Sequence, residues 1–336
     1  MDPGISIPPK GYGGIERIVA LLAKEYESRG YEVDILASEG SYVDRCNIYF
    51  NGKEGFPASK LVYLIAVLKT WFFLLRRRRK YHLIQNFGRL QYLLPILNSS
   101  VVKVMCYQRE ITSRNIKIFN YLPNKQLFFS GCSLDLVKRA KVPGKWHDVH
   151  NGIDFSKFEF NDLDLEASPL IFLGRLERIK GCHTAINVAK TTGNLLLIAG
   201  NKSTLPHEIE YFENEIMPHV DDVQIKYIGE VDDVIKNKLL RSSKALLMPI
   251  EWDEPFGIVM IEAMACGTPV IAFKRGSVDE VIDESITGYK VESLDEMIDA
   301  IRKIGEINRS ICHSVAKERF DISRIASKYL SIGSVI

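Results

Sequence analysis

The stretch at residues 249–273 restricts the fold more than any other part of the chain. It reads PIEWDEPFGIVMIEAMACGTPVIAF and places two carboxylates, Glu254 and Glu262, eight positions apart. Residues 258–265 are apolar except for Glu262, a pattern typical of a helix packed inside an α/β domain. Because glutamate is rarely buried without a partner, Glu262 is expected either on a solvated face or facing a hydrogen-bond donor, and its apolar neighbours favour the second position.

Residues 255–257 are expected to form the loop that leads into this helix, with Pro255 at the first turn. The N-terminus of a helix binds anions through its unpaired N–H groups. Helix geometry places Glu262 about 7 Å along the axis from Gly257. A nucleotide-sugar carries a phosphate, a ribose and a sugar that could contact these N–H groups, Glu262 and Glu254 together. The expected N–H donors are Phe256, Gly257 and Ile258.

The string E-P-F-G-I-V-M-I-E-A-M-A-C-G-T-P-V-I at 254–271 resembles the E-x7-E signature of retaining glycosyltransferases of the GT-B fold, in particular those of family 4. The alternative is an ordinary loop, buried helix and strand of an α/β domain. The resemblance spans nearly the whole chain and is strongest at 169–291 and 8–17. It implies an α/β protein of two Rossmann-like, doubly wound domains that face each other across a cleft.

The resemblance also implies domain boundaries. Residues 1–150 are expected to form an acceptor-side domain, and residues 165–320 a nucleotide-sugar-binding domain. The Asn-Gly-Ile-Asp element at 151–154 resembles the end of the family's first domain, and the acidic, weakly periodic residues 155–168 are interpreted as the linker. The last helix, at about 321–336, is expected to pack back on the first domain.

Short apolar runs alternate with helical stretches, which predicts parallel sheets in both domains. Helices are expected at 15–26 and 60–75. The strands expected in the first domain are 31–37, 82–85, 101–107, 126–129 and 146–149. Those expected in the second are 170–173, 195–199, 223–228, 245–249, 269–273 and 288–291.

The loop at 174–181, Gly-Arg-Leu-Glu-Arg-Ile-Lys-Gly, resembles the family's G-R-x4-K-G element. A departing nucleotide diphosphate gathers negative charge, which two fixed cations can stabilise. Arg175 can bind phosphate through two N–H groups, whereas Lys180 acts as a point charge. By this resemblance Arg175, Lys180 and Glu254 are the expected catalytic residues, with Glu254 on sugar hydroxyls and Glu262 on the ribose. The alternative is that both cations are surface charges at a strand–helix turn.

Residues 8–17, P-P-K-G-Y-G-G-I-E-R, resemble the family's N-terminal loop, and Gly13 and Gly14 are expected to approach the donor phosphates. In the family a hydrophobic strand precedes this loop. Its absence leads to the hypothesis that the sequence is truncated or has a misassigned start, with residues 5–7 as a remnant strand. The family's histidine in this domain has no match, and Gln85 and Gln108 stand roughly at its place. Arg109 is equally a site residue or a surface arginine.

Several classes of protein fit the sequence poorly. The net charge of +2 gives no reason to expect nucleic acid as a partner. Six scattered cysteines without metal-ligand spacing indicate reduced thiols in a cytosolic protein. The Asp-Leu-Asp at 162–164 falls in the expected linker and is interpreted as solvated acid, so no metal is expected. No G-x-G-x-x-G follows a strand, which argues against a dinucleotide-dependent dehydrogenase.

The apolar residues 60–75 precede Arg-Arg-Arg-Arg-Lys at 76–80. This run is too short for a membrane span, and Lys69 interrupts it. One interpretation is a helix buried on one side with a solvated basic end. The other is a basic patch that docks on anionic lipid headgroups. The expected location is cytoplasmic, and the second interpretation adds a peripheral position at the inner membrane face.

The function implied by the resemblance is metal-independent, retaining transfer of a sugar from a nucleotide diphosphate sugar, of hexosyltransferase type and without a cofactor. The acceptor class stays open between a glycan, a lipid-linked and a small-molecule acceptor, with polysaccharide biosynthesis as the setting by analogy. The family is described by same-face attack within an ion pair, in which the leaving phosphate takes the acceptor proton. The alternatives are a catalytically inactive nucleotide-sugar-binding subunit and a GT-B epimerase or phosphorylase.

Overall fold

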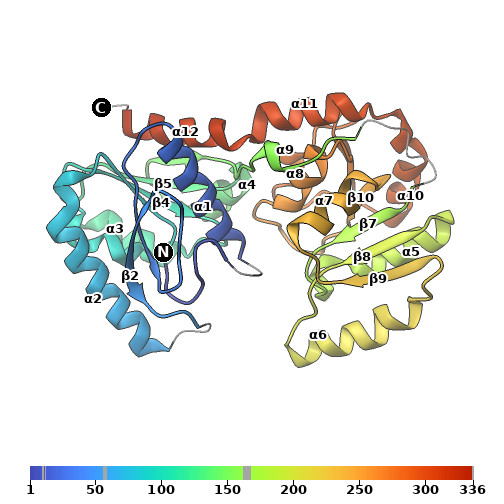
Figure 1. Ribbon diagram of the computed structural model, residues 1–336, viewed down its shortest axis with the longest axis horizontal. Coiled ribbons are helices and arrows are strands. Elements are labelled where there is room, and N and C mark those ends of the chain that lie inside the picture. The colour runs from blue at the N-terminus through green and yellow to red at the C-terminus, as the bar shows by residue number, and fades with distance from the viewer. Residues whose placement is uncertain (10, 12, 56–58, 162–167, 335–336) are drawn as a thin grey trace. The chain divides into compact units, whose positions relative to one another are not determined.

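The chain folds into two compact units (Figure 1). Residues 1–153 and 322–336 form the first unit, and residues 154–321 form the second. The computed structural model describes residues 1–336 except 10, 12, 56–58, 162–167 and 335–336, and it leaves out the side chains of 333 and 334. The last helix therefore belongs to the first unit, where the N–H of Ile322 donates to the carbonyl of Ile153 at 2.9 Å.

The first unit contains two parallel sheets, one of order β1-β2 and one of order β3-β4-β5-β6. Its strands are β1 (Asp34–Ser38), β2 (Asn47–Gly52), β3 (Leu83–Asn86), β4 (Val102–Tyr107), β5 (Leu127–Gly131) and β6 (Trp146–Asp148). Its α-helices are α1 (Gly14–Ser28), α2 (Lys60–Arg77), α3 (Ser113–Tyr121), α4 (Leu134–Ala140) and α12 (Ile322–Ser334). The five strands expected from the sequence are confirmed within a few residues. The prediction missed β2, a strand whose six residues include two asparagines and a glycine and whose first four are not buried.

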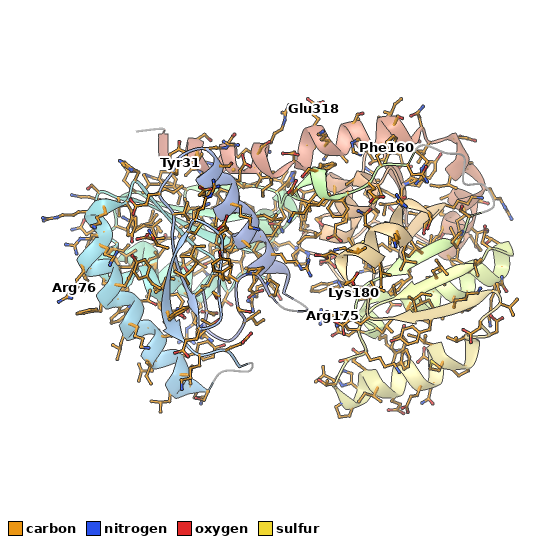
Figure 2. The ribbon with its side chains drawn as sticks, viewed as in Figure 1. Tyr31, Arg76, Phe160, Arg175, Lys180 and Glu318 are labelled. Atoms are coloured by element: carbon orange, nitrogen blue, oxygen red, sulfur yellow. The ribbon has the colours of Figure 1, made fainter. Side chains whose placement is uncertain are left out.

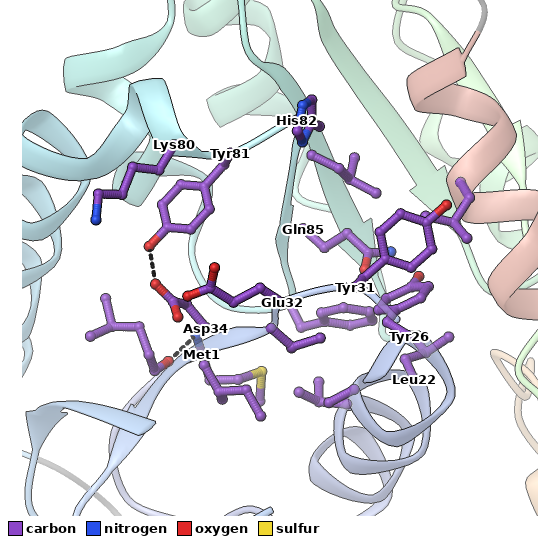
Figure 3. A pocket seen from close by; sticks show the side chains of 18 residues that line it. Met1, Leu22, Tyr26, Tyr31, Glu32, Asp34, Lys80, Tyr81, His82 and Gln85 are labelled. Carbon is purple, nitrogen blue, oxygen red and sulfur yellow. Dashed lines mark hydrogen bonds between the residues drawn. The ribbon is translucent and has the colours of Figure 1, made fainter. Parts of the chain in front are cut away.

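A gap separates the two sheets of the first unit, because β1 and β3 each pair with a single strand in the described part of the chain. A cavity of about 230 Å³ lies there, lined by residues of both strands, of α1 and of the segment after α2 (Figure 3). The Tyr81 hydroxyl donates to Asp34 across it at 2.5 Å. At its edge the amino group of Met1 donates to the Leu36 carbonyl at 3.1 Å, and burial lowers the pKa of this amine.

Residues 5–7 form no strand, so the expected remnant strand is wrong. They are instead held by side chains: the Ser38 hydroxyl donates to the Ile5 carbonyl at 2.7 Å, and the Ile7 N–H donates to the Ser41 hydroxyl at 2.9 Å. The prolines at 3 and 8 cannot donate to a ladder, which explains why this segment follows β1 without joining it. The hypothesis of a truncated or misassigned start stays a prediction.

The second unit is built on one six-stranded parallel sheet of order β12-β11-β10-β7-β8-β9. Its strands are β7 (Leu170–Leu173), β8 (Leu196–Ala199), β9 (Ile225–Gly229), β10 (Ala245–Met248), β11 (Val270–Phe273) and β12 (Gly288–Val291). Its α-helices are α5 (Cys182–Thr192), α6 (Pro206–Tyr211), α7 (Asp233–Arg241), α8 (Ile258–Ala265), α9 (Val278–Val281), α10 (Leu294–Lys303) and α11 (Arg309–Phe320). All four residues of β10 are buried, and because side chains alternate between faces, both faces of the sheet are covered.

The expected linker at 155–168 is wrong in its first part. Phe155 is buried and packs edge-on against the ring of His313 at 5.7 Å, and Phe160 lies 4.9 Å from the same ring. These aromatic contacts anchor the segment to α11, so the second unit begins at Asp154 instead of 165. The Asp-Leu-Asp at 162–164 lies outside the described residues.

Candidate active site

The strand order of the second unit reverses between β7 and β10. From β7 the chain builds outward through β8 to β9, then returns to the other side of β7 with β10. In open parallel sheets, ligands bind beyond the carboxyl ends of the strands at such a reversal. The loop after β7 carries Arg175 and Lys180, and the loop after β10 carries Glu254. The topology therefore brings the three residues expected to be catalytic to one edge of the sheet.

Lys180 and Glu254 form an ion pair that joins these two loops. The Lys180 ammonium donates to Glu254 Oε2 at 2.6 Å, and the side chains are only 17% and 12% exposed. The Trp252 indole N–H donates to the same carboxylate oxygen at 3.0 Å, and the Lys180 ammonium lies 4.8 Å from the centre of the Trp252 ring. Two donors, from Lys180 and Trp252, thus fix the position of one carboxylate oxygen at the reversal point.

Arg175 lies two residues after the end of β7 and forms an ion pair with Glu177. The N–H of Gly174 donates to the carbonyl of Ala199, which ties the loop to the end of β8. A β-carbon on Gly200 would overlap the carbonyl oxygen of Gly174, so this close approach requires glycine at 200. The backbone beside Arg175 is therefore fixed by its neighbour strand, whereas Gly174 itself has open space around its α-carbon.

Gly181 lets the two loops touch. Its φ is 75°, a conformation that favours glycine, and a β-carbon there would lie 1.9 Å from the carbonyl oxygen of Pro249. The N–H of Glu251 donates to the carbonyl of Ile179 at 2.8 Å, which adds a backbone link at the same place. Backbone contacts between the two loops therefore help to place Lys180 opposite Glu254, in addition to the ion pair between the two side chains.

The N-terminus of α8 lies in the same region. Gly257 is the residue before the helix, with φ 73° and ψ 63°, and Phe256 is buried against the ring of Phe320 at 6.0 Å. The expected position of Pro255 in the first turn is wrong, because the helix begins at Ile258 and the proline lies in the preceding loop. Gly257 has a left-handed conformation and ends the loop. The helix therefore begins at Ile258, three residues after Pro255.

Glu262 faces a donor, as its apolar neighbours predicted, and that donor is Lys236 of α7. The Lys236 ammonium lies 2.6 Å from Glu262 and 3.0 Å from Asp233. Burial alone lowers the pKa of Lys236, but the two carboxylates outweigh burial, and the net shift is upward. Both carboxylates of the E-x7-E element therefore have a lysine partner.

The remaining expected residues lie in the first unit, at the start of α1. Gly13 precedes the helix and Gly14 is its first residue; a β-carbon on Gly13 would overlap the ring of Pro9. Burial raises the pKa of Glu16, and the charge of Arg109 opposes that shift. Gln85 lines the cavity between β1 and β3. The donor contact predicted for Gly13 and Gly14 stays a prediction.

Three partners of the site, Trp252, Glu177 and Lys236, were not predicted from the sequence. Trp252 and Glu177 stand two residues from an expected site residue, so their proximity in sequence was a usable signal. Lys236 had only the Asp233–Lys236 spacing of a helical ion pair, which does not indicate its partner on α8. Among the described residues no group of three or more His, Cys, Asp or Glu side chains could hold a metal ion.

Known proteins resemble this chain in sequence and in fold. Residues 155–319 match the model of the family described as glycosyl transferases group 1. The glycogen synthase of Mycobacterium tuberculosis is 30% identical over 154 residues, which cover 44% of this chain and 36% of that protein. A phosphatidyl-myo-inositol mannosyltransferase of Mycolicibacterium smegmatis is 26% identical over 220 residues, covering 59% of this chain and 55% of that protein. The chain spans about half or less of the length of the curated relatives that it matches first.

The structure resembles that of Alr3699/HepE from Anabaena in complex with UDP-glucose, with a TM-score of 0.72 at 18% identity, over 99% of this chain and 98% of that one. A sucrose-phosphate synthase structure shares the same architecture over 99% of this chain. The chain therefore has the GT-B fold, and the predicted fold class is confirmed.

Gly181→Ala tests the close backbone contact between the loop that carries Lys180 and the loop that begins at Pro249. We expect it to lower the free energy of unfolding by about 3 kcal/mol, because left-handed strain and overlap with Pro249 add. Gly193→Ala is the matched control. Its φ of 68° is also left-handed, but no atom beyond those of the adjacent chain lies within 4 Å of an added β-carbon, so the free energy of unfolding is expected to fall by only about 1 kcal/mol. Urea unfolding of both variants measures the difference, and equal losses would contradict the contact.

Proposed function

We propose, from the match of residues 155–319 to the model of glycosyl transferases group 1, that the chain transfers a sugar from a nucleotide diphosphate sugar to an acceptor with retention of the anomeric configuration. The observation that carries this proposal is the Lys180–Glu254 ion pair at the reversal point of the sheet, with Arg175 on the same loop as Lys180. Assignment to family 4 within these glycosyltransferases rests on the E-x7-E element and belongs to the proposal.

The donor would lie across the carboxyl ends of β7 and β10. Its diphosphate would contact Arg175, Lys180 and the N–H groups at residues 256–258. Its sugar hydroxyls would donate to Glu254, and its ribose to Glu262. These contacts use the preference of Arg for bidentate phosphate binding and of carboxylates for hydroxyl donors.

Lys180 would exchange partners when the donor binds. The lysine is held 2.6 Å from Glu254, and a diphosphate beside it would compete with this carboxylate for the ammonium. Sugar hydroxyls could then replace Lys180 as donors to Glu254, so that neither charge is left unpaired. As the glycosidic bond breaks, Lys180 and Arg175 would stabilise the charge that gathers on the departing diphosphate. No metal or cofactor is part of this proposal.

The acceptor is proposed to be a glycan, a lipid-linked glycan or a small molecule. The name of the Mycolicibacterium relative includes a phospholipid, phosphatidyl-myo-inositol, which gives a reason to begin acceptor tests with lipid-linked substrates. The proposed location is cytoplasmic, with peripheral contact to the inner membrane face through residues 76–80, and the proposed setting is polysaccharide biosynthesis.

A direct test screens UDP-, GDP- and ADP-sugars for thermal stabilisation, with UDP-glucose as the first probe because a related fold was crystallised with it. Labelled product analysis with and without a crude acceptor extract then separates the possible activities. Transfer requires the acceptor, epimerisation does not, and binding without any product would indicate an inactive subunit.

Glu262→Ala should weaken binding of the nucleotide-sugar selected by this screen by about tenfold or more, because ribose hydroxyls lose a charged acceptor. Isothermal titration calorimetry measures the dissociation constant. Glu292→Ala, at an exposed carboxylate outside the site, should leave it unchanged. An unaltered constant in the Glu262 variant would remove this residue from the donor site.

Lys180→Ala should mainly lower the turnover rate, by about 100-fold or more, since a charge that stabilises the departing diphosphate is lost. Initial rates at saturating donor measure the effect. Lys290→Ala is the control, because Lys290 is also a partly buried lysine in an ion pair of the same unit, with Asp279 at 3.2 Å. Wild-type turnover in the Lys180 variant would end its catalytic role.

Incubation with EDTA should leave the transfer rate nearly unchanged, because the proposed charge stabilisation comes from side chains and N–H groups. The measurement compares initial rates before and after chelation, followed by addition of Mg²⁺ or Mn²⁺. Loss of activity that either ion restores would show a metal-dependent reaction.

A further inference from the structure

Helix α2 of the first unit exposes a continuous apolar stripe. Six of its large apolar side chains are between 42% and 65% exposed. The set is Leu61, Leu64, Ile65, Leu68, Phe72 and Leu75. They make up a quarter of the large hydrophobic side chains that are exposed in the described part of the chain.

The spacing of these six residues places them within a sector about 100° wide along the helix. The opposite side, with Ala66, Val67, Thr70 and Leu74, is buried against the first unit. The rotation of the helix is fixed, because the Trp71 indole N–H donates to the Gln91 carbonyl at 2.9 Å. The stripe therefore has a fixed place on the exposed side of α2, a helix at the periphery of the first unit (Figure 1).

Cations surround this stripe. Residues 60–80 contain seven Lys and Arg and no Asp or Glu, in a chain whose net charge is only +2. The Arg76 guanidinium lies 4.2 Å from the centre of the exposed Phe72 ring. Figure 2 shows the Arg76 side chain extending from α2. Arg77 turns inward to Tyr49 and Asp34, but Lys69, Arg79 and Lys80 are exposed. Apolar and basic groups thus share one accessible face.

We propose that this face is a docking surface for anionic lipid bilayers. The apolar stripe would lie in the boundary between headgroups and acyl chains, with the helix parallel to the membrane, and the basic end would contact the anionic headgroups. Amphipathic helices of this composition bind membranes through buried apolar area and attraction to anionic lipids together. The inference builds on the membrane contact proposed above for residues 76–80, and vesicle binding can be tested separately from sugar transfer.

Two other fates of the stripe fit the observations less well. Among the helices that the structure describes, none has the length and hydropathy to cross a membrane. Pairing of two copies through the stripe would bring two sets of basic side chains together without intervening acids, and like charges oppose such an interface. A bilayer with anionic headgroups satisfies both the apolar and the charged groups.

Cosedimentation of the full chain with vesicles tests the proposal. Binding is expected to phosphatidylcholine vesicles that contain phosphatidylglycerol, weaker binding to phosphatidylcholine alone, and weakening by added salt. Leu68→Gln and Phe72→Gln should each lower the partition coefficient about tenfold, since each removes apolar area. Arg79→Gln should lower it about fivefold, the effect of one cation near an anionic surface.

Controls separate docking from general stickiness and from unfolding. Ile311→Gln removes an exposed apolar side chain of α11, and Arg302→Gln an exposed arginine of α10; both should bind vesicles like the wild type. Thermal unfolding should be unchanged in every variant because all these side chains are exposed. Equal binding by the α2 variants, no binding to anionic vesicles, or a dimer in sedimentation velocity that Leu68→Gln dissociates would overturn the proposal.

Discussion

The ion pair between Lys180 and Glu254 is the interaction on which the account of the site depends. It connects the loops of two neighbouring strands at the one place where the strand order of the sheet reverses. Neither charge would be stable alone at this depth, because a partly buried charge without a partner is costly. The pair therefore holds each side chain in place and keeps it ready for a ligand that supplies both an anion and hydroxyl groups.

Backbone geometry supports this pair from several directions. Gly181 allows the two loops to touch, and Gly276 lies so close to the backbone of Glu254 that a β-carbon there would overlap it. The N–H of Ser277 donates to the Glu254 carbonyl at 2.9 Å. The second carboxylate repeats the principle, since Glu262 is held by Lys236. Such preorganisation allows a site to stabilise developing charge without rearranging as the bond breaks.

Much of this architecture could be predicted from the sequence, and the failures have physical reasons. Strands β7 and β12 are short, and three of the four residues in each are buried, so pattern alone located both at their observed bounds. Pattern could not locate β2, whose first four residues are not buried, or the anchoring of Phe155 by His313, which depends on a helix about 160 residues away in the chain. Lys236 was missed because its partner is set by helix packing.

A crystal structure with a bound nucleoside diphosphate would test the central claim most directly, namely that side-chain cations and backbone amides hold the diphosphate at the reversal point of the second sheet. The account predicts the diphosphate oxygens within hydrogen-bonding distance of Arg175 and Lys180, with the Lys180–Glu254 contact lengthened. A diphosphate bound elsewhere, or bound here with Arg175 and Lys180 turned away from it, would contradict the account.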